Sequence, residues 1–139
     1  MAFKINISEK GKTYKVESEN ENLIGKKIGE NIQGQELMPE LAGYILQISG
    51  TSDKAGFPGK KDTEGSALKR VLLKKGWGMH KRYKQAVKKG LRLRRSVRGN
   101  TISTDIVQIN LIVKKQGNKK LEEIFKKEEK TEEKKEEAQ

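Results

Sequence analysis

The amino-acid sequence predicts a mainly β protein: a small β-barrel, closed or partly open, with basic loops and a charged C-terminal helix. Two observations support this fold class. Apolar and polar residues alternate over several short segments, which is the period of a half-buried strand. Glycines interrupt the stretches between these segments and weaken any helix there. We expect the barrel to occupy residues 1–117 and the charged segment, helical or frayed, to occupy residues 118–139.

A β-hairpin is expected first. Residues 2–8 and 13–18 alternate apolar and polar side chains, and the polar residues 9–12 between them suit a turn. Residues 23–41 contain three glycines among scattered isoleucines and leucines, which favours short, bent strands over a helix. A short helical turn is expected at residues 39–42, where a proline opens the segment.

The middle of the chain predicts three more strands. Residues 43–49 are apolar enough for a buried strand, and the glycines and proline of residues 50–65 predict an ordered loop or a series of turns. A strand is expected over residues 67–75. Residues 91–98 alternate leucine and valine with arginine and predict another strand.

The longest strand is predicted over residues 101–113, with a bulge or bend near Asp105 and Ile106, where the alternation shifts. After it, Asn118 is a candidate N-cap for a helix that starts at Lys119. Three apolar residues at helical spacing are expected to dock one turn of this helix on the body: Leu121, Ile124 and Phe125.

Positive charge is concentrated in one part of the chain. The 139 residues include 31 Lys and Arg against 19 Asp and Glu, a net charge of +12. Residues 66–100 contain 13 basic residues, all six arginines among them, and no acidic residue. Such a run implies an external polyanion, because solubility alone does not require this segregation. A membrane surface is disfavoured, since residues 76–95 contain three glycines and no apolar stripe.

The side chains of this run suit RNA. Arginine binds phosphate through a planar fork and also stacks on bases, while lysine supplies a point charge. Trp77, His80 and Tyr83 alternate with cations and are placed to stack on exposed bases. The alternative for Trp77 is a core or lid residue, and its glycine neighbours leave both interpretations open. His80 is interpreted as a phosphate or backbone contact, because no partner is evident to tune it for catalysis.

No enzymatic site is expected. The chain has no cysteine and one histidine, which excludes thiolate and histidine-rich metal sites. Asp53 is expected to cap a turn, and Asp62 and Glu64 to balance neighbouring lysines. We therefore expect no catalytic residue, no metal and no cofactor. Without an apolar signal core or a stretch long enough to span a membrane, a cytoplasmic location is expected.

Two blocks of sequence resemble a known family. Ile48–Gly59 reads ISGTSDKAGFPG, and Ser96–Gly99 reads SVRG. Together they resemble small-subunit ribosomal protein six of archaea and eukaryotes, in its archaeal form, and the similarity extends from about Phe3 to Lys115. The chain departs from the family pattern at Thr51, where members commonly carry a second glycine, and at Gly59, where they commonly carry methionine.

The resemblance implies a β-barrel body bound to small-subunit rRNA in the cytoplasm, beside neighbouring ribosomal proteins. We expect no membrane partner, no small-molecule substrate and no obligate homo-oligomer. A free RNA-binding regulatory module outside the ribosome is the main alternative. An RNA-modifying enzyme is a weaker one, because no catalytic group is found. The candidate rRNA-binding residues are Lys54, Lys60, Lys61, Lys69, Arg70, Lys74, Lys75, Trp77, His80, Lys81, Arg82, Tyr83, Lys84, Arg92, Arg94, Arg95 and Arg98.

Overall fold

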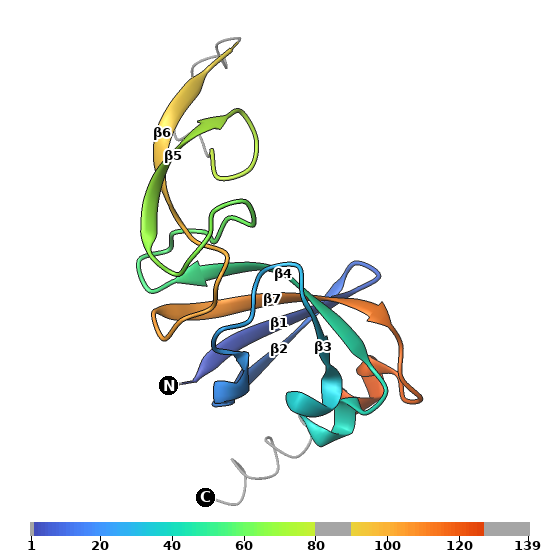
Figure 1. Cartoon of the computed structure of the whole chain (residues 1–139). Helices are drawn as coiled ribbons and strands as arrows, with labels where there is room; N and C mark the ends of the chain where they lie inside the picture. The colour runs from blue at the N-terminus through green and yellow to red at the C-terminus, as the bar shows by residue number, and fades with distance from the viewer. Residues whose placement is uncertain (1, 80–89, 127–139) are drawn as a thin grey trace, which may run out of the picture.

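The computed structural model describes residues 2–79 and 90–126, and its fold is mainly β (Figure 1). The expected fold class is confirmed at this level. The strands are β1 (Phe3–Glu9), β2 (Lys12–Ser18), β3 (Asn31–Gln33), β4 (Ile45–Asp53), β5 (Leu68–Lys74), β6 (Arg92–Arg98) and β7 (Ile106–Lys115). Three short 3₁₀ helices are η1 (Glu21–Leu23), η2 (Gly34–Glu36) and η3 (Pro39–Leu41). One helix begins at residue 121 and is described to residue 126.

The strands form two separate sheets. The larger has five strands in the order β2-β1-β7-β4-β3, in which β1 and β7 are parallel and the other neighbours are antiparallel. Strands β5 and β6 form an antiparallel pair of their own. No ladder joins β2 to β3 within the described residues, so the larger sheet is open and a barrel is not confirmed.

The N-terminal hairpin is confirmed. Glu9 pairs with Lys12, and the two residues between them have positive φ, 46° at Lys10 and 82° at Gly11. Two consecutive residues with positive φ are typical of a type I′ turn, whose twist matches that of the flanking strands. Glycine adopts this conformation without strain, which explains its place in the turn.

The expectation of bent strands over residues 23–41 is wrong for most of that segment. Only β3 is a strand there, and the 3₁₀ helices close through short local hydrogen bonds, such as Leu37 N–H to the Gly34 carbonyl at 3.1 Å. Gly34 is buried, and a Cβ there would lie 2.2 Å from the Leu41 carbonyl oxygen. The glycine therefore permits a close approach of backbone rather than a bend in a strand. The helical turn expected at residues 39–42 is confirmed as η3.

Strand boundaries differ from the prediction at two places. Strand β4 continues past residue 49 to Asp53, because Thr51 and Ser52 pair with Ile109 and Gln108 of β7. Strand β7 begins at Ile106 rather than residue 101, after a turn in which Ile106 N–H bonds to the Ser103 carbonyl at 3.1 Å. That turn and a register shift beside it account for the break in alternation.

The hydrophobic core lies against one face of the larger sheet. Its fully buried side chains include Ile5 and Ile7 of β1, Leu46 and Ile48 of β4, and Ile109 and Leu111 of β7. The same core takes in the C-terminal helix through the three predicted residues, Leu121, Ile124 and Phe125, so the expected docking is confirmed. The Phe125 ring stacks on Tyr14 with centroids 4.8 Å apart and planes 12° apart.

The helix starts two residues later than Lys119. No helix in the described ranges is long and apolar enough to cross a membrane.

Candidate nucleic-acid interface

Strands β5 and β6, called here the basic ladder, extend away from the larger sheet on the side opposite η2 and η3 (Figure 1). Their register runs from Leu68 opposite Arg98 to Lys74 opposite Arg92. The basic residues of these two segments therefore lie on paired strands, as the alternation predicted. Both strands are close to their predicted positions, residues 67–75 and 91–98. The rRNA-binding candidates on the ladder are Lys69, Arg70, Lys74, Arg92, Arg94, Arg95 and Arg98.

Cations dominate one face of the basic ladder. Residues directly opposite each other in an antiparallel pair share a face, and alternate residues do as well. One face therefore holds Arg70, Lys74, Arg92 and Arg94, all exposed. Lys74 stands directly across from Arg92, and like charges in that position destabilise a strand pair. Because residues 66–100 contain no carboxylate, nothing in that segment offsets this repulsion.

The opposite face of the ladder is more apolar. Leu73 and Val97 are buried there, and Val71 is half-buried. Lys69, Leu93 and Arg95 lie at the exposed positions of this face. The Lys69 ammonium donates a hydrogen bond to the Glu64 carbonyl oxygen at 3.0 Å.

An ion pair joins the base of the basic ladder to the larger sheet. The Arg98 Nε donates to Asp53 Oδ2 at 2.9 Å, and Arg98 Nη1 lies 3.4 Å from Asp105 Oδ2. Asp53 Oδ1 also accepts the Phe57 N–H at 2.8 Å, which confirms that Asp53 caps a turn. The Arg98 side chain is only 19% exposed, so its charge is engaged within the protein.

The same contacts set the acidity of Asp53. Burial alone raises the pKa of its carboxyl, but the hydrogen bonds from Arg98 and Phe57 and the charge of Arg98 outweigh it, so the pKa lies below the ordinary value. Asp53 therefore stays ionised and paired. This is the chemistry of a structural carboxylate and not of a general acid or base.

The two sequence blocks that carry the family resemblance meet at this junction. Asp53 belongs to the first block and Arg98 to the second, 45 residues later. In the second block Val97 is fully buried, and Gly99 packs so closely that a Cβ would lie 1.8 Å from the Gly65 carbonyl oxygen. The backbone of Arg98 also exchanges hydrogen bonds with Pro58 and Lys60, each at 2.9 Å. The ion pair of Asp53 with Arg98 and the close packing of Val97 and Gly99 give the residues of both blocks a structural role at this junction.

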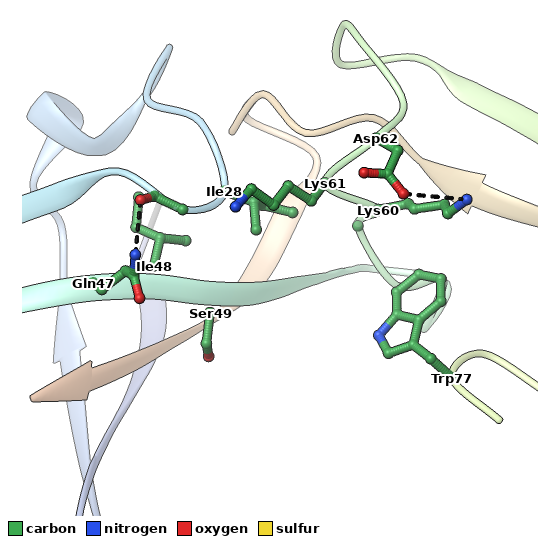
Figure 2. Close-up of a pocket in the computed structure, with 10 residues that line it drawn as sticks. Ile28, Gln47, Ile48, Ser49, Lys60, Lys61, Asp62 and Trp77 are labelled. Atoms are coloured by element: carbon green, nitrogen blue, oxygen red, sulfur yellow. Dashed lines mark hydrogen bonds and ion pairs between the residues drawn. The ribbon is translucent and has the colours of Figure 1, made fainter.

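A pocket of about 410 Å³ opens where the larger sheet, the segment after β4 and the end of β5 meet (Figure 2). Three of the candidates line it: Lys60, Lys61 and Trp77. Trp77 is 52% exposed, which argues against the interpretation as a core residue. Lys60 lies 3.7 Å from Asp62, which confirms that Asp62 balances a neighbouring lysine. Gln47, also in the lining, donates to the Gly29 carbonyl at 3.0 Å.

The other candidates are dispersed or lie beyond the described ranges. Lys54 and Lys75 are exposed, one after β4 and one after β5. The remaining five fall within residues 80–89, outside the described residues: His80, Lys81, Arg82, Tyr83 and Lys84.

Sequence reasoning did not find a row of amides on the outer face of the larger sheet. Asn6 Nδ2 and Gln108 Nε2 both donate to Asn110 Oδ1, at 3.1 and 2.9 Å. Ser49 Oγ donates to the Asn110 carbonyl at 3.0 Å. The sequence did contain a signal for this row, because polar residues alternate with apolar ones in both β1 and β7. The parallel pairing of these two strands brings their polar side chains together.

Comparison with known proteins identifies the family. The model of the ribosomal protein S6e family matches residues 1–126. The chain belongs to the S6e family. A relative from Methanococcus maripaludis strain C5, named small ribosomal subunit protein eS6, is 48% identical over 120 residues, covering 85% of this chain and 91% of the relative. The eS6 protein of Archaeoglobus fulgidus is 45% identical over 136 residues, covering 93% and 99%.

Membership of the S6e family confirms the resemblance seen in the two sequence blocks. These archaeal relatives also agree with the archaeal form expected from the sequence. The family is one of structural ribosomal proteins, which confirms that the chain is not an enzyme.

Proposed function

We propose that this protein is a structural constituent of the cytoplasmic small ribosomal subunit and binds rRNA through the basic ladder and the basic loops beside it. Neighbouring ribosomal proteins are its other partners. The observation that carries the proposal is the exposed cationic face of the ladder, with Lys74 directly across from Arg92 and no carboxylate in residues 66–100. The names of the relatives as small ribosomal subunit proteins support small-subunit rRNA as the polyanion of this proposal.

RNA phosphates supply the charge that the ladder lacks. A two-stranded ladder is marginally stable by itself, and repulsion between facing cations weakens it further. Phosphates placed along Arg70, Lys74, Arg92 and Arg94 relieve this repulsion and release condensed counterions from the RNA. Binding therefore stabilises the ladder, and the binding affinity falls steeply as the salt concentration rises.

Arg98 has a different role from the other cations of the ladder. Its guanidinium is already shared between Asp53 and Asp105, so it positions the ladder on the body rather than neutralising phosphate. The exposed cations on the cationic face are free of such partners within the described residues, and they form the RNA contact.

Sedimentation of cell lysate at low and high salt tests this function, combined with a map of protein–RNA crosslinks. At low salt the protein is expected in the small-subunit fraction, with crosslinks on β5 and β6. Absence from that fraction at low salt would contradict the proposal. A soluble pool with a sharp RNA sequence preference would instead favour the free regulatory module.

A further inference from the structure

A tight turn displays Trp77 at the end of β5. The Met79 N–H donates to the Gly76 carbonyl at 3.0 Å, and the two glycines beside the indole have φ of 126° and 72°. A Cβ at Gly78 would lie 3.1 Å from Leu73 Cδ1, so the turn folds back over a buried leucine of the ladder. The turn is thus anchored while the Trp77 side chain remains half-exposed beside the pocket.

The pocket next to this indole combines features that suit one nucleotide. Figure 2 shows that its walls come from separate parts of the chain: Gln47 and Ser49 from β4, Lys60 to Asp62 from the segment that follows, and Trp77 from beyond β5. Two lysines and one tryptophan therefore line a single opening. A volume of about 410 Å³ lies within the usual range for sites that hold small organic groups.

We propose that this pocket holds one unstacked nucleotide of the bound RNA. The base stacks on Trp77, and Lys60 and Lys61 neutralise the adjoining phosphates. Aromatic side chains bind bases in this way only where the base has left its helix, because paired bases already stack on one another. The inference rests on the proposed function and specifies which part of the RNA this site recognises: a bulged or looped nucleotide rather than a continuous duplex.

Asp62 is compatible with this occupant. It is the single acidic residue among the described residues that line the pocket, and its side chain is 81% exposed at 3.7 Å from the Lys60 ammonium. An exposed carboxylate at the rim accepts hydrogen bonds from the N–H groups of a base and is free to turn away from a phosphate. Lys61 extends across Gly29, where a Cβ would lie 3.0 Å from its Cε, so the glycine leaves room for the lysine side chain.

The experiment uses Trp77 as its own probe, because it is the chain's one tryptophan. The full chain is titrated with three RNA hairpins that differ at one position: fully paired, with a single bulged adenosine, and with an abasic bulge. Stacking of one base predicts about five- to 150-fold tighter binding of the adenosine bulge than of the paired hairpin. The abasic bulge should bind like the paired hairpin, and only the adenosine bulge should quench Trp77 emission.

Variants separate the two halves of the site. Trp77→Ala should abolish the preference for the bulged adenosine, and Trp77→Phe should keep part of it. Lys61→Gln should weaken binding of the bulged hairpin, whereas Lys114→Gln, an exposed lysine near the end of β7, should leave the preference unchanged.

Equal affinity for all three hairpins, without a change in Trp77 emission, would overturn this inference while the proposed function stands. Failure to bind any of the three hairpins at low salt would overturn both.

Discussion

Thr51 and Gly59 provide a quantitative test of how the first sequence block folds. The two residues lie face to face, since Gly59 N–H donates to the Thr51 carbonyl at 2.9 Å. A Cβ at Gly59 would lie 2.1 Å from Thr51 Oγ1 and 2.9 Å from Ile28 Cδ1. From the resemblance described above we expect glycine at residue 51 and methionine at residue 59, whereas this chain has the larger side chain at residue 51.

We expect the Thr51 side chain to limit the size of the residue that fits at position 59. Thr51 is buried and β-branched, so its side chain has few alternative rotamers, whereas Ile28 Cδ1 is the end of a flexible chain. Gly59→Ala should therefore destabilise the protein by about 1–3 kcal/mol, the usual cost of overpacking a well-filled site. In a Thr51→Gly background the hydroxyl is gone, and the same change should cost less than about 1 kcal/mol.

Urea unfolding of the four proteins in this cycle measures the coupling. The expected interaction free energy between residues 51 and 59 is at least about 1 kcal/mol, with the double variant more stable than the sum of the single changes predicts. Additivity within about 0.3 kcal/mol would refute the reasoning, because two side chains in direct collision cannot act independently.

Three further predictions concern the junction and the core. Gly99→Ala should destabilise the protein by about 3 kcal/mol or more, because the new Cβ meets the Gly65 backbone. Gly50→Ala is the control: a Cβ there has no atom within 4 Å, so the free energy of unfolding should change by less than about 1 kcal/mol. Comparable losses in the two variants would contradict the close approach of Gly99 to Gly65. Asp53→Asn should cost about 1–3 kcal/mol in urea unfolding, because Arg98 loses its charged partner. Folding lowers the pKa of Asp53, so the stability that its ionised carboxylate contributes is complete above the ordinary pKa of 3.8 and is lost as the pH falls through the pKa of the folded state. On acidification the wild type should therefore lose more stability than the variant. Parallel plots of unfolding free energy against pH for the two proteins would count against the pairing. Phe125→Ala should lower the free energy of unfolding by about 3 kcal/mol, because it removes a buried ring stacked on Tyr14. Ile112 is 43% exposed, so Ile112→Ala should cost less than about 1 kcal/mol. Equal effects would show that the C-terminal helix is not docked as described.

Alternation predicted the strands well because it reports directly on burial. The hairpin of β1 and β2, the two strands of the basic ladder and the apolar face of the C-terminal helix were all predicted close to their observed positions. The pattern failed over residues 23–41, where the glycines serve close backbone packing, as at Gly34 beneath Leu41. It also ended β4 too early, because the pairing of Thr51 with Ile109 depends on a strand far away in the chain.

Prediction of the site from the sequence was likewise limited where it depended on contacts between residues far apart in the chain. Charge segregation correctly marked β5 and β6 as a cationic unit, since it is a property of the chain itself. Two features of the site could be found only from the three-dimensional structure. One is the pairing of Arg98 with Asp53, which removes an arginine from the exposed set. The other is the meeting of Trp77 with Lys60 and Lys61 in one pocket, because these residues lie on opposite sides of β5 in the sequence.

The salt dependence of rRNA binding tests the proposed role of the basic ladder most directly. The comparison uses the wild type, a double variant of the cationic face (Arg70→Gln with Arg94→Gln) and a matched control on the exposed face of the hairpin of β1 and β2 (Lys4→Gln with Lys15→Gln). The ladder variant should reduce the slope of log K against log salt by about 1.4–1.8, which corresponds to two lost phosphate contacts, while the control keeps the wild-type slope. An unchanged slope in the ladder variant, or an equal reduction in the control, would contradict the assignment.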